Sequence, residues 1–468
     1  MNRLHTWLRK GWLGAPASTM RLMYQKALLI AWPAALEGLL ISVISSADTM
    51  MVGTISPAAI AAVGLTMQPR MILLLIVQSL SIGTTALVAR RKGAGDEPGV
   101  RLCLEQSMYI SLALGVLMSV SGVFFSEPLM RLAGANEDTL ALSASYFRII
   151  SLGFVANSLQ LCVCAAFRGL GKTRVTLLTH LASNLINVVL NYLLIGGKLG
   201  FPRLGVDGAA IATLIGTVSG AVLALWFASN KRSAFQYRPG RPRFDRDTLS
   251  GLYKVGSSSA AEAGFMRIGF FINNRIIAGL GTVAFAAFHI VSQVSILSFT
   301  LCDGVAAAGV AMVGQSLGAG KEDDARRYVT VTRHLSVVAS ILLMLAIFFS
   351  RRVLAGLFTD DEAALSAATA GLLVLIPSLM LQNGRVVYAG CLRGAGDVRY
   401  VALIALLSVT ILRPVLTWLF SYPLNSLWPA LMLSATGPWF SFLIDALVRY
   451  WLLAKRIRSG IWTQVKLH

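Results

Sequence analysis

Residues Pro33–Gly53 read PAALEGLLISVISSADTMMVG, and this apolar stretch decides the fold class of the chain. It has the length that a bilayer span requires, about 20 apolar residues. It nevertheless contains two carboxylates, Glu37 and Asp48. An acid at the centre of a membrane helix costs at least ~2.5–3.5 kcal/mol to insert, so such a residue normally faces a cavity or a partner. We therefore expect both acids to have a function.

The composition extends this interpretation to the whole chain. Of 468 residues, 56% are hydrophobic and only 13% are charged, with a mean hydropathy of +0.70. Soluble proteins are about 25% charged. The sequence therefore predicts an all-α polytopic membrane protein with about twelve spans. The predicted spans are 27–52, 58–88, 103–125, 140–166, 173–195, 206–229, 252–278, 283–313, 333–350, 364–390, 400–420 and 429–454.

The charge is strongly basic, +20 formally, and most Lys and Arg residues fall in alternate loops and at both ends. Basic loops stay on the cytoplasmic side of a membrane. We thus predict an inner (plasma) membrane protein whose termini and basic linker are cytoplasmic. A cysteine placed at Ser233 in that linker is predicted to be inaccessible from outside. Lipid headgroups, rather than nucleic acid, are the expected partner of this charge.

Cysteine usage and short motifs argue against several other classes. The five cysteines lie in or near apolar segments without histidines close by, so we interpret them as small apolar residues. No cleavable signal peptide is evident. The sequence contains no HExxH, Walker loop, GxSxG or DDxxD. We predict no enzyme activity, no cofactor, and transport driven by an ion gradient.

The two halves of the chain are repeats. Four features recur at one offset of 225 residues: GAG at 93–95 and 318–320, Glu37 and Glu262, AIAA at 59–62 and AFAA at 284–287, and FRGLGKTR at 167–174 and LRGAGDVR at 392–399. Such repeats commonly hold substrate between them and alternate access by rocking. The predicted parts are a cytoplasmic segment 1–26, a six-helix lobe 27–229, a basic linker 230–251, a six-helix lobe 252–454 and a cytoplasmic tail 455–468.

The repeats diverge at their intramembrane polar residues. Asp48 corresponds to Asn273, whereas Asn187 and Asn191 correspond to leucines. Asn184, Asn187 and Asn191 are spaced to share one face of a helix. Their amides could bond a neighbouring helix or surround a cation at Asp48. This pattern suggests an ion site in the first half, for sodium or for a proton.

The second half carries its own polar residues inside predicted spans. Its members are Glu262, Asn273, His289, Gln293, Asp303, Gln382 and Asn383. We predict that they contribute to substrate binding, since polar groups in spans face a cavity or a partner.

The ordered motifs ADTMMVG, AAIAAVGL, FRGLGKTR, NVVLNYLL, VGQSLGAG and LRGAGDVR resemble the multidrug and toxic compound extrusion (MATE) family of secondary transporters. The resemblance covers the chain from Lys26 to about Arg458. It implies twelve helices in two pseudo-symmetric lobes around a central cleft. Asp48 matches the family's first-helix aspartate, Glu262 its seventh-helix glutamate and Asn187 its fifth-helix asparagine near the cation site. Two departures are Asn191 and the pair Gln382–Asn383, where some members have an aspartate.

The predicted function is export of organic, often cationic compounds in exchange for sodium ions or protons. Asp48, Asn187, Asn191 and Glu37 are the predicted cation-coupling residues, and Asp48 and Asn187 would hold sodium. We expect small organic substrates, membrane lipids and a monomer. One alternative is a flippase for lipid-linked saccharides, for which cavity-facing arginines would bind pyrophosphate. The arginines in question are Arg70, Arg267, Arg275, Arg385 and Arg413. A membrane-embedded enzyme is the other alternative.

Overall fold

The computed structural model describes residues 17–230, 233–237, 244–359, 361–424 and 433–465. Within these ranges the chain is helical and contains no strand. It divides into two compact units. The N-terminal unit contains Leu36–Ser257, and the C-terminal unit contains the chain up to Ala35 together with Ser258–Lys466. The division falls within two long helices, and the predicted lobe limits stay a prediction.

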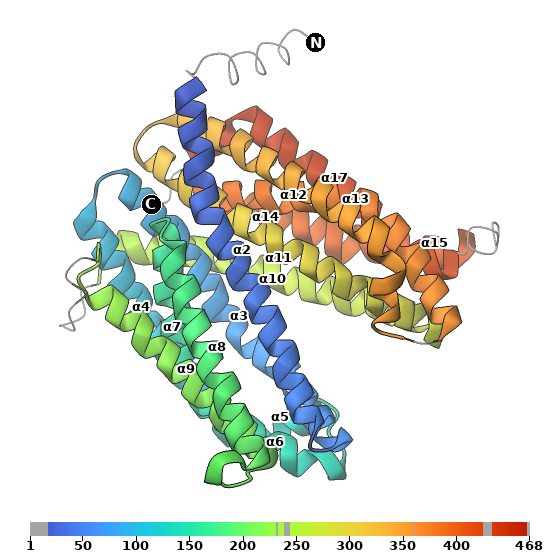
Figure 1. Cartoon of the computed structure of the whole chain (residues 1–468). Coiled ribbons are helices and arrows are strands. Elements are labelled where there is room, and N and C mark those ends of the chain that lie inside the picture. Colours follow the sequence, from blue (N-terminus) through green and yellow to red (C-terminus); the bar gives the residue numbers. More distant parts are fainter. Residues whose placement is uncertain (1–16, 231–232, 238–243, 360, 425–432, 466–468) are drawn as a thin grey trace. The chain divides into compact units, whose positions relative to one another are not determined.

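Figure 1 labels most of the helices along the chain. The first half contains α2 (Ala17–Gly53), α3 (Pro57–Gly93), α4 (Glu97–Phe124), α5 (Ser126–Leu132), α6 (Glu137–Leu152), α7 (Phe154–Gly169), α8 (Thr173–Gly196) and α9 (Gly205–Ser229). The second half contains α10 (Arg246–Ala278), α11 (Thr282–Gly318), α12 (Glu322–Gly356), α13 (Glu362–Ala395), α14 (Val398–Ala405), the π-helix η2 (Leu406–Leu412), α15 (Arg413–Ser421) and α17 (Leu433–Ser459).

These elements form the predicted membrane-spanning architecture. In the described part of the chain, nine helices are long and apolar enough to cross a membrane, and ten if α6 and α7, which are bent by 50° at Gly153, form one span. The more polar α10 and α17 are outside that count. With α6–α7 and α14–η2–α15 each taken as one segment, the described chain has twelve long helical segments. The predicted all-α polytopic fold is confirmed.

The sequence repeat is also a repeat of helix boundaries. Helix α3 begins at Pro57 and α11 at Thr282 (282 − 57 = 225), and their ends, Gly93 and Gly318, have the same offset. Helix α8 spans 173–196, while α14–η2–α15 spans 398–421. The glycines of the repeated loops explain why the motifs recur. Gly95 and Gly320 have φ of +74° and +71°, and Gly171 and Gly396 have +75° and +88°, which only glycine adopts without strain.

The polar segment between the two halves is docked on the N-terminal unit. Phe235 is 1% exposed and packs edge-on against Phe167, with ring centroids 5.1 Å apart. Ser233 is only 8% exposed, so a cysteine there would be shielded from reagents on either side. Hydrogen bonds donated by the hydroxyl and the backbone of Thr248 hold the pKa of Asp245 below its usual range.

Candidate functional site

The polar centre of the N-terminal unit is Asp48, on the C-terminal part of α2. Asn191 Nδ2 donates to Asp48 Oδ1 at 2.7 Å. In the amide orientation that satisfies its neighbours, Asn187 Nδ2 donates to both Asp48 oxygens at 2.9 and 3.0 Å, and its oxygen lies 3.2 Å from Thr213 Oγ1. Asn187 and Asn191 are 4% and 1% exposed. The structure therefore brings together three of the four predicted cation-coupling residues.

Helix α8 positions both amides because residues four apart lie on one face of an α-helix. It packs beside α9 (Figure 1), which contributes Thr213. Thr213 was not among the predicted site residues, because an isolated threonine in an apolar span carries no distinctive pattern. Asn191 Oδ1 is buried and has no hydrogen-bond partner within the described part of the chain. The site thus has one carboxylate, two amides that donate to it, and an unused amide oxygen.

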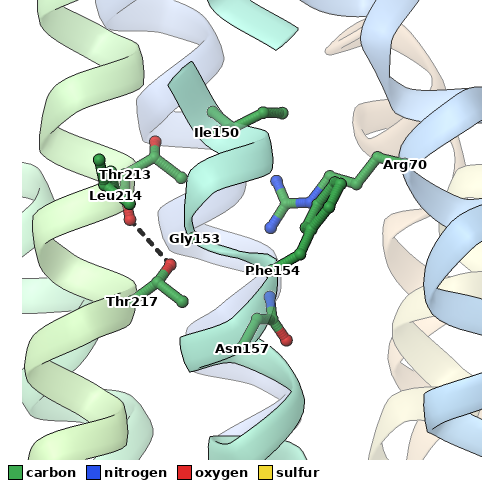
Figure 2. Close-up of a pocket in the computed structure, with 8 residues that line it drawn as sticks. All are labelled: Arg70, Ile150, Gly153, Phe154, Asn157, Thr213, Leu214 and Thr217. Carbon is green, nitrogen blue, oxygen red and sulfur yellow. Dashed lines mark hydrogen bonds between the residues drawn. The ribbon is translucent and has the colours of Figure 1, made fainter. Parts of the chain in front are cut away.

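A small cavity adjoins this site (Figure 2). It is lined by Arg70, Ile150, Gly153, Phe154, Asn157, Thr213, Leu214 and Thr217. The guanidinium of Arg70, from α3, points toward Gly153 and Asn157 in this view. The positive charge of Arg70 also acts on Asp48, although the two do not form an ion pair within 4.0 Å in the described structure. Asp48 therefore lies in the field of a fixed cation that does not neutralise it by contact.

Glu37, the fourth predicted coupling residue, is held by different partners. Arg168 Nη2 donates to it at 2.9 Å and Thr176 Oγ1 at 2.7 Å, and His180 Nε2 lies 3.5 Å away. Its side chain is buried. Glu37 is thus the acceptor of a buried ion pair. Its contacts come from α7 and α8, and none of them is shared with Asp48.

Glu262 occupies the equivalent place in the C-terminal unit. Arg393 Nη2 donates to Glu262 Oε1 at 2.5 Å. The two pairs are repeat-related, since Arg168 and Arg393 also differ by 225. The motifs FRGLGKTR and LRGAGDVR already contained these arginines, and the shared offset with the two glutamates was the signal that could have predicted the pairs.

The other predicted substrate-binding residues fall into two groups. His289, Gln293 and Asp303 are exposed on α11, and His289 contacts the ring of Phe285. The remaining three are buried and bonded. Asn273 Oδ1 accepts from Thr417, Gln382 Oε1 accepts from Arg385, and Asn383 Nδ2 donates to Ser340. Only the exposed group offers side chains that a substrate could reach without breaking these bonds.

Comparison with known proteins identifies the family. The MatE family model matches residues 33–193 and 259–419, one match in each repeat. The chain is 30% identical over 397 residues to the multidrug resistance protein PmpM of Pseudomonas aeruginosa, covering 83% of this chain and 82% of that protein. It is 27% identical to a probable multidrug resistance protein NorM of Thermotoga maritima, covering 92% of each.

The fold agrees with this assignment. The solved MATE transporter VcmN of Vibrio cholerae, in its bent form, is similar with a TM-score of 0.84 and 20% identity, covering 95% of this chain and 99% of that structure. Three findings lead to one conclusion. The family model matches once in each repeat, the relatives are similar along nearly the whole chain, and the helical architecture is shared. The chain belongs to the MATE (MatE) family of multi-pass membrane transporters.

Proposed function

We propose that this chain exports organic, often cationic compounds in exchange for sodium ions or protons, and that Asp48 binds the coupling ion. The observation that carries the proposal is the contact of the Asp48 carboxylate with the Asn187 and Asn191 amides inside a membrane-spanning unit. An intramembrane carboxylate is costly and marks ion pathways. The names of the relatives, multidrug resistance proteins, support organic compounds as the cargo.

The hydrogen bonds suggest how the site exchanges its ion. Both amides present N–H groups to the carboxylate, which suits an ionised Asp48 without a bound cation. Rotation of an amide by 180° would turn its oxygen toward Asp48, where it could coordinate a hard cation or accept a hydrogen bond from a protonated carboxyl. Occupation of the site thus requires the two amides to reorganise. We propose that this rearrangement links the ion to the packing of α2 against α8.

The exposed polar side chains of α11 are the proposed substrate contacts of the C-terminal unit. His289, Gln293 and Asp303 lie on its accessible surface, and Asp303 supplies the negative charge that an organic cation would require. Glu262 is the weaker candidate of the predicted set, because Arg393 already occupies its carboxylate.

The test is drug–ion exchange in proteoliposomes under separate sodium and proton gradients. We expect Asp48→Asn to fold but to lose ion-driven uptake by at least about tenfold, because the substitution keeps the size and removes the charge. Asn191→Ala should weaken coupling as well. Asn184→Ala is the matched control on the same helix, because no hydrogen bond joins Asn184 to Asp48 among the described residues. Wild-type coupling in Asp48→Asn would refute the assignment.

A further inference from the structure

The interior of the C-terminal unit contains a carboxylate that is saturated by arginines. Asp445, on α17, is fully buried. Its Oδ2 accepts from Nε of Arg413 at 3.1 Å, from Nη2 of the same side chain, and from Arg449 Nη2 at 2.5 Å. Its Oδ1 accepts from the hydroxyl of Ser408. Two guanidiniums therefore share one carboxylate, so this group alone is left with a formal charge of +1 (2 − 1).

A third guanidinium adds to the excess. Arg385, on α13, is bonded to the neutral oxygen of Gln382 at 2.8 and 3.1 Å. In the described structure no carboxylate oxygen lies within 4.0 Å of it. The charges of Arg449 and Arg413 act on it unfavourably, and that of Asp445 acts favourably. The three arginines and Asp445 thus carry +2 formally (3 − 1).

The nearby acids do not remove this excess. Glu262 acts on Arg385 and Arg449 from a distance but is bonded to Arg393. Asp303 is exposed on α11 and interacts electrostatically with both Arg393 and Arg385. The full group has four arginines and three acids, so a positive charge remains (4 − 3 = +1). Uncompensated charge at membrane depth is expensive, which predicts a further anionic partner.

Two buried donors locate the place for that partner. Arg449 is 3% exposed and Gln382 is 0% exposed, and neither Arg449 Nε nor Gln382 Nε2 has a hydrogen-bond acceptor among the described residues. The orientation of the Gln382 amide is fixed because its oxygen accepts from Arg385. A buried donor without an acceptor is unfavourable and rare in native proteins. Arg449 Nε and Gln382 Nε2 are donors that an acceptor would satisfy, whereas Asn383 Oδ1, which is also buried without a partner in the described structure, is itself an acceptor and would not contact an anion.

These donors come from helices that approach closely at the same level. A Cβ added at Gly384 would lie 2.7 Å from the ring of Tyr450, so α13 touches α17 at this point. Tyr388 stacks on Tyr450 with ring centroids 5.4 Å apart. Arg385 follows Gly384 in sequence and is bonded to Gln382, and Arg449 precedes Tyr450. The contact therefore places Arg449 near Arg385, on which its charge acts, and Arg385 is in turn bonded to Gln382.

The cluster exists only in the second repeat. The first repeat has Gln160 in place of Arg385 and Val188 in place of Arg413, at the offset of 225. Val189 corresponds to Pro414, and the segment before that proline is the π-helix η2. Residues five apart diverge by about 140° on an α-helix but nearly align in a π-turn, whose hydrogen bonds join i and i+5. Ser408 and Arg413 consequently both reach Asp445.

We propose that the C-terminal unit binds a monovalent anion between Arg385, Arg449 and Gln382. The ligand is a halide ion or a carboxylate group, since both accept several N–H donors and carry the single negative charge that the cluster lacks. A carboxylate could be supplied by an acidic or zwitterionic compound that the transporter carries. In that case the inference extends the proposed export function; a halide site is independent of it.

The test uses the purified full-length chain in detergent at constant ionic strength, with chloride replacing isethionate stepwise. We expect a saturable rise in melting temperature of about 2–4 °C, because a ligand that binds only the folded state stabilises it. Arg385→Gln and Gln382→Leu should each abolish or strongly right-shift the response. Arg275→Gln is the control, because Arg275 is an exposed arginine of the same unit. Bromide with anomalous diffraction should place the ion beside Arg385.

A competition experiment distinguishes a halide ion from a carboxylate group as the ligand of this site. Benzoate, with benzamide as its neutral counterpart, is titrated against chloride. A right-shift by benzoate alone would assign the site to carboxylates as well as to halides, and no shift would assign it to halides. A chloride-independent melting temperature in the wild type, or an unchanged response in Arg385→Gln, would overturn the proposal. None of these readouts involves transport, so they are separate from the test of Asp48.

Discussion

At the scale of single residues, the charges inside the helices are of two kinds. Glu37 and Glu262 are bonded to arginines of the repeated motif, Arg168 and Arg393. Asp48 instead accepts hydrogen bonds from neutral amides. A guanidinium partner neutralises a carboxylate and so weakens its attraction for a mobile cation. Neutral amides leave the charge of the carboxylate in place, and the attraction remains. This difference favours Asp48 as the ion site and a structural role for the two pairs.

The pair in the C-terminal unit yields a direct prediction. Arg393→Gln should destabilise the fold by about 3–5 kcal/mol, because it leaves a buried carboxylate without its counter-charge. The double substitution Glu262→Gln/Arg393→Gln should recover most of the loss, since no uncompensated charge remains. The measurement is the melting temperature in detergent, with expression level as a second readout.

Arg352→Gln is the control for this pair. Its partner is Glu362, and the two side chains are 76% and 80% exposed, so its loss should have little effect. If Arg393→Gln is as stable as wild type while Glu262→Gln selectively loses affinity for cationic drugs, Glu262 is a substrate ligand as the sequence predicted.

At the scale of elements, the two repeats share their helix boundaries, and small residues lie where two helices pack closely against each other. Gly269 on α10 lies against the backbone of the π-helix η2, where an added Cβ would be 2.3 Å from the Val409 carbonyl oxygen. Thr410 Oγ1 also donates to the Phe265 carbonyl at 2.7 Å. The π-helix that positions Ser408 and Arg413 is therefore fixed by close contact with α10.

Gly269→Ala should consequently lower the melting temperature, with a cost of about 1–3 kcal/mol for overpacking against backbone. Gly264→Ala is the matched control, because it lies on the same helix and an added Cβ there meets nothing within 4 Å. It should be neutral or slightly stabilising, since alanine favours helix over glycine. Equal melting temperatures for the two variants would show that α10 and η2 can move apart without cost.

At the scale of the whole molecule, the chain is a multi-pass transporter with most of its basic charge in alternate loops. We predict that the segment between the two halves is cytoplasmic. Gln236 is exposed, unlike Ser233 and Phe235, so a cysteine at Gln236 should react with a membrane-impermeant maleimide only in inverted vesicles or lysed cells. The five native cysteines are buried and give a low background. Ready labelling in intact cells would show that this segment lies outside the cell and that the predicted topology is wrong.

The membrane-spanning class, the two repeats and the family could be predicted from the sequence alone, as could Asp48 as the candidate for the coupling acid. These follow from local composition and from the spacing of residues within one helix, as for Asn187 and Asn191. Tertiary structure alone decided which charges are paired. Glu37 and Glu262 each form an ion pair with an arginine 131 residues away in the sequence. Asp445 forms an ion pair with Arg413 of another helix. Such partners depend on how helices pack, because the free energy of a buried charge is set by the groups that contact it in space.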